Sequence, residues 1–187
     1  MSELALKLIK EAKEKRLTRL DLGNCGLTEL PEELFELVWL EELILSNDWF
    51  NFAFKKKKYD PIKSQNKGTA NNIKIINPKI KLLVRLKKLI ASRQECISDL
   101  KPIKDLTQLE QLDVSKTGVI SIVSLKKLIR LRQLDFSETD VISTVSLKYL
   151  VSLQQLDASD TSLLNINSLK SLKKYKSLIL TILQFMI

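Results

Sequence analysis

Leucines recur along the chain at regular spacings, most regularly between Leu109 and Lys174. One unit of 22 residues occurs there three times in succession, as LEQLDVSKTGVISIVSLKKLIR, LRQLDFSETDVISTVSLKYLVS and LQQLDASDTSLLNINSLKSLKK. Each unit opens with L-x-x-L-x-apolar, whose alternation predicts a short strand buried on one face. Apolar residues then follow at a spacing of three, as at Ile122, Leu125 and Leu128, which is typical of a 3₁₀ segment. One unit is therefore a strand, a loop and a tight helical return.

The same pattern extends towards the N-terminus in less regular steps. Earlier repeats open at Leu17, Leu40 and Leu86. Residues 1–16 instead carry apolar residues at helical spacing, and Ser2 can cap the helix that they predict. An amphipathic helix before a solenoid usually covers the edge of the first repeat, and a helix on a membrane surface is the alternative. We expect a capping helix at 1–16 and one array of about seven repeats over 17–187.

The second repeat is interrupted by an insertion at about residues 50–72. Leu27 and Leu30 of the first repeat are matched only at Ile73 and Ile76, 46 residues later, although the step here is 23 residues. The inserted segment carries six Lys against one Asp, so it supplies over half of the net charge of +9. Its start is rich in aromatic residues, namely Trp49, Phe50, Phe52, Phe54 and Tyr59. We expect it to project from the loop edge and to take part in binding, with Trp49, Phe50 and Phe54 as candidate contacts.

Residues 17–180 resemble the leucine-rich-repeat superfamily, and the phrase TGVISIVSLKKLIRLRQLDFS looks like its bacterial, internalin-like class of 22-residue repeats. The resemblance implies an α/β solenoid: a curved parallel sheet on the concave face and short 3₁₀ or irregular returns on the convex face. Thr117, Thr139 and Thr161 stand where the family has Asn or Cys, and their hydroxyls offer fewer donors to the loop backbone. The opening KRLTRLDLGNCGLTELPEELFELVWLEELILSN is similar to the repeat arrays of bacterial Roco-type proteins, which are joined to a Ras-like GTPase module.

Within each strand, positions two, three, five and seven point away from the core, so they form the concave face. Neighbouring parallel strands lie about 4.8 Å apart, so position five of three successive repeats forms a column of carboxylates. We expect mutual repulsion to raise their pKa values or to recruit a cation or a basic partner. The candidate partner-binding residues on this face are Gln111, Asp113, Gln133, Asp135, Gln155 and Asp157.

Other interpretations of the carboxylate column compete with a basic partner. A metal needs oxygens that converge on a point, and a catalytic pair needs unlike environments, whereas the three repeats are near copies. Copied repeats also simply copy their surface. Arg132 lies beside Glu110 on the neighbouring strand, so some of the charge on this face is paired internally. We predict no metal and no cofactor.

Composition excludes most enzyme classes. There is no His, no glycine-rich phosphate loop and no cluster of Cys, so we predict a non-enzymatic protein interaction module with a protein or peptide ligand. A regulatory fragment of a larger Roco-like GTPase is the alternative. Nucleic-acid binding is disfavoured, since Lys55–Lys58 beside the aromatic residues is the only segment suited to it.

Location and association follow from the ends of the chain and from its cysteines. Two Cys and an N-terminus without an apolar run predict a cytoplasmic protein with no membrane span. The segment ILQFMI follows the last strand and carries no polar cap, so the open edge could belong to a longer array or mediate self-association.

Overall fold

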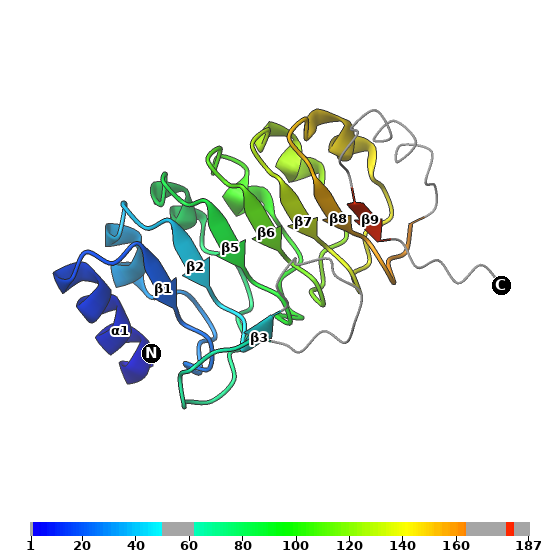
Figure 1. The fold of residues 1–187 in the computed structure, drawn as a ribbon. Helices are drawn as coiled ribbons and strands as arrows, with labels where there is room; N and C mark the ends of the chain where they lie inside the picture. Colours follow the sequence, from blue (N-terminus) through cyan, green and yellow to red (C-terminus); the bar gives the residue numbers. More distant parts are fainter. Residues whose placement is uncertain (1, 50–61, 164–178, 182–187) are drawn as a thin grey trace.

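A single parallel sheet runs the length of the molecule in the computed structural model, which describes residues 2–49, 62–163 and 179–181 (Figure 1). In these residues seven strands pair in the order β1-β2-β5-β6-β7-β8-β9. Their register aligns the fourth residue of every repeat, from Leu20 and Leu43 onwards. The strands are β1 (Arg19–Asp21), β2 (Glu42–Ile44), β5 (Lys88–Ile90), β6 (Gln111–Asp113), β7 (Gln133–Asp135), β8 (Gln155–Asp157) and β9 (Ile179–Thr181).

Short 3₁₀ helices form the opposite side of the solenoid, as the spacing of three predicts. They are η1 (Glu32–Glu36), η2 (Pro78–Leu82), η3 (Lys101–Ile103), η4 (Val123–Lys127) and η5 (Val145–Tyr149). The aliphatic positions of the strands and returns face each other and form one continuous core, in which Leu112, Leu125 and Leu134 are fully buried. The predicted leucine-rich-repeat solenoid is confirmed.

The loops after β1, β5, β6, β7 and β8 each turn through one left-handed residue. The residues at this eighth position have φ between 51° and 60°, and they are Asn24, Arg93, Lys116, Glu138 and Asp160. In the last three of these loops a threonine follows and closes the turn, because its hydroxyl donates to a carbonyl three residues earlier: Thr117 to Val114 at 2.6 Å and Thr139 to Phe136 at 2.6 Å. Each threonine therefore satisfies a carbonyl of its own repeat.

The N-terminal helix α1 (Glu3–Glu14) lies beside β1 at one end of the sheet (Figure 1). The Ser2 hydroxyl caps it by accepting a hydrogen bond from the Ala5 amide at 3.3 Å. Ala5, Ile9 and Ala12 are buried against the first repeat, so the apolar stripe faces the core.

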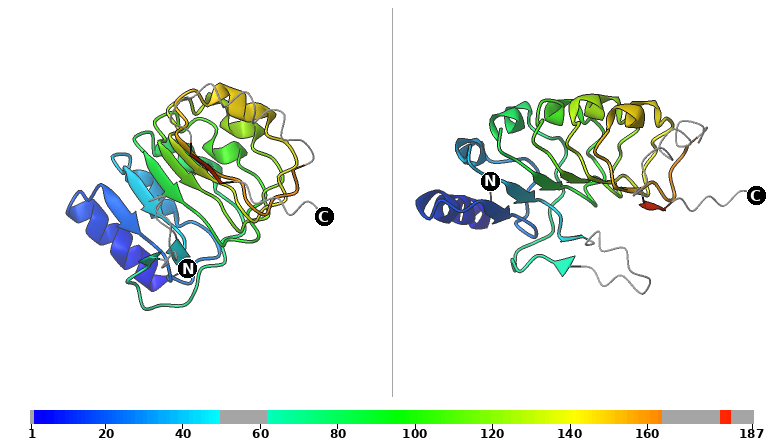
Figure 2. Two further views of the ribbon diagram at one scale, coloured as in Figure 1. Left: turned by 45° about the vertical axis from the view of Figure 1, so that its right-hand side comes forward. Right: turned by 45° about the horizontal axis from the view of Figure 1, so that its top comes forward.

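The insertion opens as an antiparallel hairpin of β3 (Asp48–Trp49) and β4 (Ile62–Lys63). This hairpin lies on the side of the sheet away from the 3₁₀ helices (Figure 2, right). The chain then returns along the first repeat, where Asn66 Nδ2 donates to the carbonyls of Asp21 (3.0 Å) and Gly23 (2.9 Å). We expected the insertion to project from the loop edge; of its described part, residues 64–71 follow the loop after β1, while Trp49 at its start packs on Ile44 and Ile90 of the concave face.

Asn71 marks the point where the chain rejoins the repeat, two residues before the predicted boundary. It lies 46 residues after Cys25, so it occupies the ninth position of the interrupted repeat. Its Oδ1 accepts from the amides of Cys25 (3.0 Å) and Leu27 (2.9 Å). Its Nδ2 donates to the carbonyls of Leu22 (2.7 Å) and Leu45 (2.8 Å). One buried side chain therefore joins the first two repeats.

The C-terminal edge of the described sheet is β9, which pairs with β8 through Gln155 and Ile179. The segment for which we predicted self-association, residues 182–187, lies outside the described residues, and that prediction stays untested.

Candidate functional site

Three carboxylates form a column on the concave face. The sheet register places Asp113 opposite Asp135 and Asp135 opposite Asp157, as the repeat spacing predicts. Each Oδ1 accepts two hydrogen bonds from the serine two residues later. Ser115 gives one from its amide (3.0 Å) and one from its hydroxyl (2.7 Å), and the two following repeats copy this arrangement. The D-x-S pattern therefore fixes the carboxylates in one orientation.

The carboxylates differ in how much of each faces solvent. Asp113 is only 2% exposed, whereas Asp135 and Asp157 are half-buried. Asp113 lies next to Ile90, which is itself fully buried. Position five lies outside the main core, but Ile90 and Asp113 are buried there, so the accessible part of the column is Asp135 and Asp157.

Burial dominates the electrostatics of the column. Loss of solvent raises the pKa of Asp113 to about 6, against the favourable hydrogen bonds from Ser115 and Ser92. Burial also raises the pKa of Asp135 well above its ordinary value, with repulsion from Asp113 as the second cause. The direction matches our expectation, but the first cause is desolvation rather than repulsion between the carboxylates.

A row of glutamines runs beside the column at position three. Gln111, Gln133 and Gln155 are aligned by the register, and Gln133 Nε2 donates to Gln155 Oε1 at 2.5 Å. Gln111 Nε2 is buried and has no hydrogen-bond partner in the part of the chain that the structure describes. A buried donor without an acceptor costs about 1–3 kcal/mol, so this amide is an unusual feature of the face.

Charged residues of alternating sign continue the face towards the start of each strand. Glu41 pairs with Lys87 (2.9 Å), Glu110 with Arg132 (3.8 Å) and Arg19 with Glu42 (3.7 Å). The first two pairs line a shallow groove of about 410 Å³ that also includes Lys88, Gln111 and Gln133. The concave face thus offers paired charges, amides and two accessible carboxylates side by side.

Trp49 lies on this face but is not exposed. It is 3% exposed and packs with Ile44 and Ile90, the position-five residues of β2 and β5, in a small cluster separate from the main core. The tryptophan therefore anchors the insertion over the face, which bears on its predicted role as a partner contact. Phe50 and Phe54, the other two aromatic candidates, lie outside the described residues, as do Lys55–Lys58.

Replacing Trp49 with Ala should lower the free energy of unfolding by about 3 kcal/mol, because a large buried side chain leaves a cavity over Ile44 and Ile90. Urea denaturation followed by circular dichroism measures the loss. Tyr149→Ala, at a position that is 47% exposed, is the control and should cost under about 0.5 kcal/mol. Equal losses in the two variants would show that Trp49 does not anchor the insertion.

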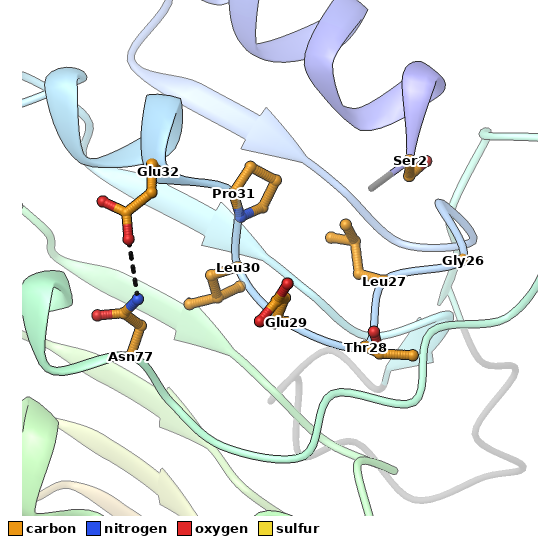
Figure 3. A pocket seen from close by; sticks show the side chains of 9 residues that line it. All are labelled: Ser2, Gly26, Leu27, Thr28, Glu29, Leu30, Pro31, Glu32 and Asn77. Carbon is orange, nitrogen blue, oxygen red and sulfur yellow. Dashed lines mark hydrogen bonds between the residues drawn. The ribbon is translucent and has the colours of Figure 1, made fainter.

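A second hollow of about 260 Å³ lies between the start of α1 and the loop after β1 (Figure 3). Two of its polar side chains, Asn77 and Glu32, already have partners. Asn77 Nδ2 donates to Glu32 Oε1 (3.5 Å), and Lys79 Nζ pairs with Glu32 Oε2 (2.5 Å). We therefore place the candidate site on the concave face.

Chemically reactive groups are scarce around either hollow. Burial raises the pKa of the Cys25 thiol to about 11, so it stays protonated at neutral pH. No group of three or more His, Cys, Asp or Glu side chains is placed to hold a metal ion within residues 2–49, 62–163 and 179–181. Over the same ranges, no helix has both the length and the apolar character needed to cross a membrane.

Asn71, which joins the first two repeats, was not singled out by the sequence interpretation, and the unpaired donor of Gln111, itself a predicted contact, was not foreseen. Asn71 could have been found from the 46-residue offset to Cys25. The buried donor of Gln111 carries no sequence signal, since Gln133 and Gln155 occupy the same repeat position and are bonded to each other.

The architecture defines the class of protein: a leucine-rich-repeat solenoid with a polar concave face. It is similar in structure to internalin C2 (inlC2) from Listeria monocytogenes str. 4b F2365, with a TM-score of 0.63 and 18% identity over 97% of this chain and 93% of that one. It also resembles an internalin (inlF) of the same strain, with a TM-score of 0.50 and 13% identity over 98% of this chain and 64% of that one.

The structural likeness confirms the internalin-like repeat fold that the sequence predicted. No protein-family model matches the chain, and no curated protein sequence does. The resemblance of the opening repeats to Roco-type arrays is not tested by these two structures and stays a prediction, as does a cytoplasmic location.

Proposed function

We propose that the protein is a non-enzymatic interaction module that holds a segment of a protein or peptide against β6, β7 and β8. Solenoids of this class present an extended concave surface, and interaction is the role such a surface suits. The observation that carries the proposal is the accessible part of the carboxylate column. Asp135 and Asp157 keep one fixed orientation through Ser137 and Ser159, so they are organised before any ligand arrives.

The buried Trp49 of the hairpin supports a defined site rather than binding along the whole concave face. Trp49 covers Ile44 and Ile90, and the carboxylate column begins on the next strand with Asp113. Position five of the repeat is apolar in the strands under the hairpin and acidic in the strands beyond it. A partner segment that lies beyond Trp49 therefore meets carboxylates, and Lys or Arg side chains suit them best.

The test is a titration with a labelled peptide that carries arginine at alternate positions. Asp135→Asn/Asp157→Asn should weaken binding about tenfold, the equivalent of about 1.4 kcal/mol, because two charge-assisted contacts are lost. Asp140→Asn, the same change at an exposed residue away from the column, is the matched control and should change affinity less than twofold.

Fluorescence anisotropy at about 150 mM salt is the suitable measurement, because the net charge of +9 repels a cationic peptide over long distances and salt shortens that range to about 8 Å. Binding by the wild type and the double variant with equal affinity would refute the proposal.

A further inference from the structure

Lys88 is the one cation of the concave groove that has no acidic partner in the described part of the chain. Its neighbours in the groove, Lys87 and Arg132, are paired with Glu41 (2.9 Å) and Glu110 (3.8 Å). On the strand that flanks it, Glu42 pairs with Arg19 at 3.7 Å. Since the surrounding carboxylates already have cations, the ammonium group of Lys88 is left available to a ligand.

The residue directly opposite Lys88 on the next strand is Gln111. Its Nε2 is buried and has no acceptor among the described residues, and the side chain lines the same groove as Lys88. The oxygen and the NH₂ group of a glutamine side chain are similar in size, so turning the amide group by 180° can direct Nε2 into the groove. An acceptor supplied from outside would then satisfy the N–H group, while the amide oxygen takes the buried position.

From this arrangement we infer that Lys88 and Gln111 form a carboxylate subsite. An ammonium group and an amide N–H on neighbouring strands suit the two oxygens of an Asp or Glu side chain, because charge-assisted hydrogen bonds are the strong ones. The inference rests on the proposed function and makes its partner more specific: a segment that carries both an acidic residue and a basic one.

The sheet geometry sets the spacing between those two residues. From Lys88 on β5 to Asp135 on β7 or Asp157 on β8 there are two or three strand steps of about 4.8 Å, with a shift of two residues along the strand. These steps combine to roughly 12–16 Å. An extended peptide advances about 3.4 Å per residue and turns alternate side chains to one face, so residues four apart lie about 13.6 Å apart on the same side.

The partner segment therefore has the form acid-x-x-x-base. The carboxylate lies on Lys88 and Gln111, and the basic side chain reaches Asp135 or Asp157. The contacts of the acidic and the basic residue both use side chains of regular strands. Neither contact therefore depends on the insertion residues that the structure does not describe.

Four capped peptides separate this inference from the proposed function. They are Ac-GDAAARG-NH₂, the two versions with either charged residue replaced by Ala, and the version with both replaced. We expect the Asp to increase affinity about five- to tenfold over the peptide that carries Arg alone, as measured by ¹H–¹⁵N NMR titration. The Gln111 side-chain NH₂ signals should shift with the acidic peptides only.

Lys88→Met should abolish the advantage that the Asp provides, whereas Lys87→Met, in the same groove but paired with Glu41, should change it less than twofold. If the Asp makes no difference to binding by the wild type, or if both lysine variants behave alike, the subsite is refuted while the acidic column stands. If none of the four peptides binds, the proposed function fails together with the subsite.

Discussion

Asn71→Ala should destabilise the protein by about 3 kcal/mol or more. The side chain satisfies two amides, of Cys25 and Leu27, and two carbonyls, of Leu22 and Leu45, all within the first two repeats. Each buried backbone group that loses its partner costs about 1–3 kcal/mol, and Ala offers neither donor nor acceptor. Part of the cost is recovered where water enters, which is why the expected loss is less than the sum of four such penalties.

Urea denaturation provides the measurement, and the neighbouring residue provides a matched control. Asn72→Ala removes the same functional group from a residue that is exposed, so the change in unfolding free energy should stay under about 0.5 kcal/mol. Thr139→Val should fall between the two at about 1 kcal/mol, because its hydroxyl donates to a single carbonyl, that of Phe136. If the two asparagine variants are equally stable, Asn71 does not join the repeats in the way described.

Asp113→Asn should stabilise the protein at neutral pH. The pKa of Asp113 is raised to about 6 in the fold, mainly by burial, above an ordinary value of 3.8. For an acid whose folded pKa is raised, the stabilising contribution is complete below the unfolded pKa and is lost as pH rises through the folded one. Asp113 therefore costs the fold up to about 3 kcal/mol at pH 7 and nothing below about pH 4.

The amide of the variant keeps an oxygen to accept from the Ser115 amide and hydroxyl, so the change removes charge and leaves these two bonds. The difference in unfolding free energy between Asp113→Asn and the wild type should be small near pH 4, grow between pH 4 and 6, and level off above. Asp140→Asn, at an exposed position, should show no such trend. A pH-independent difference for Asp113→Asn would contradict a raised pKa.

The repeated part of the fold could be predicted from the sequence because each repeat position meets the same surroundings in every unit. Leu112, Leu134 and Leu156 are buried at one level of the core, and one leucine pattern specifies all three. The same logic placed Asp113, Asp135 and Asp157 in one column. The apolar spacing of two in the strands and of three in the returns depends only on residues close together in the sequence. The sheet register then follows from aligning the repeat units.

The insertion could not be predicted in the same way, since it has no second copy with which to compare it. The sequence suggested Trp49 either as a partner contact or as an anchor of the inserted loop, and nothing in the local pattern decides between the two. Its burial depends on contact with Ile90, 41 positions further along the chain and one strand beyond its own repeat. The burial of Asp113 is equally non-local, since its neighbour on β5 is the covered Ile90.

The ninth position of the repeat bears on how this array could have grown. Asn71 reaches back to the preceding unit, so neither of the first two repeats can be copied or lost without leaving backbone groups of the other unpaired. Thr117, Thr139 and Thr161 bond only within their own units. A gene segment encoding one threonine unit therefore encodes both the donor and the acceptor of its threonine hydrogen bond. Duplication of such a segment lengthens the solenoid without disturbing the turns on either side, and three nearly identical units in a row are the outcome that such a process leaves.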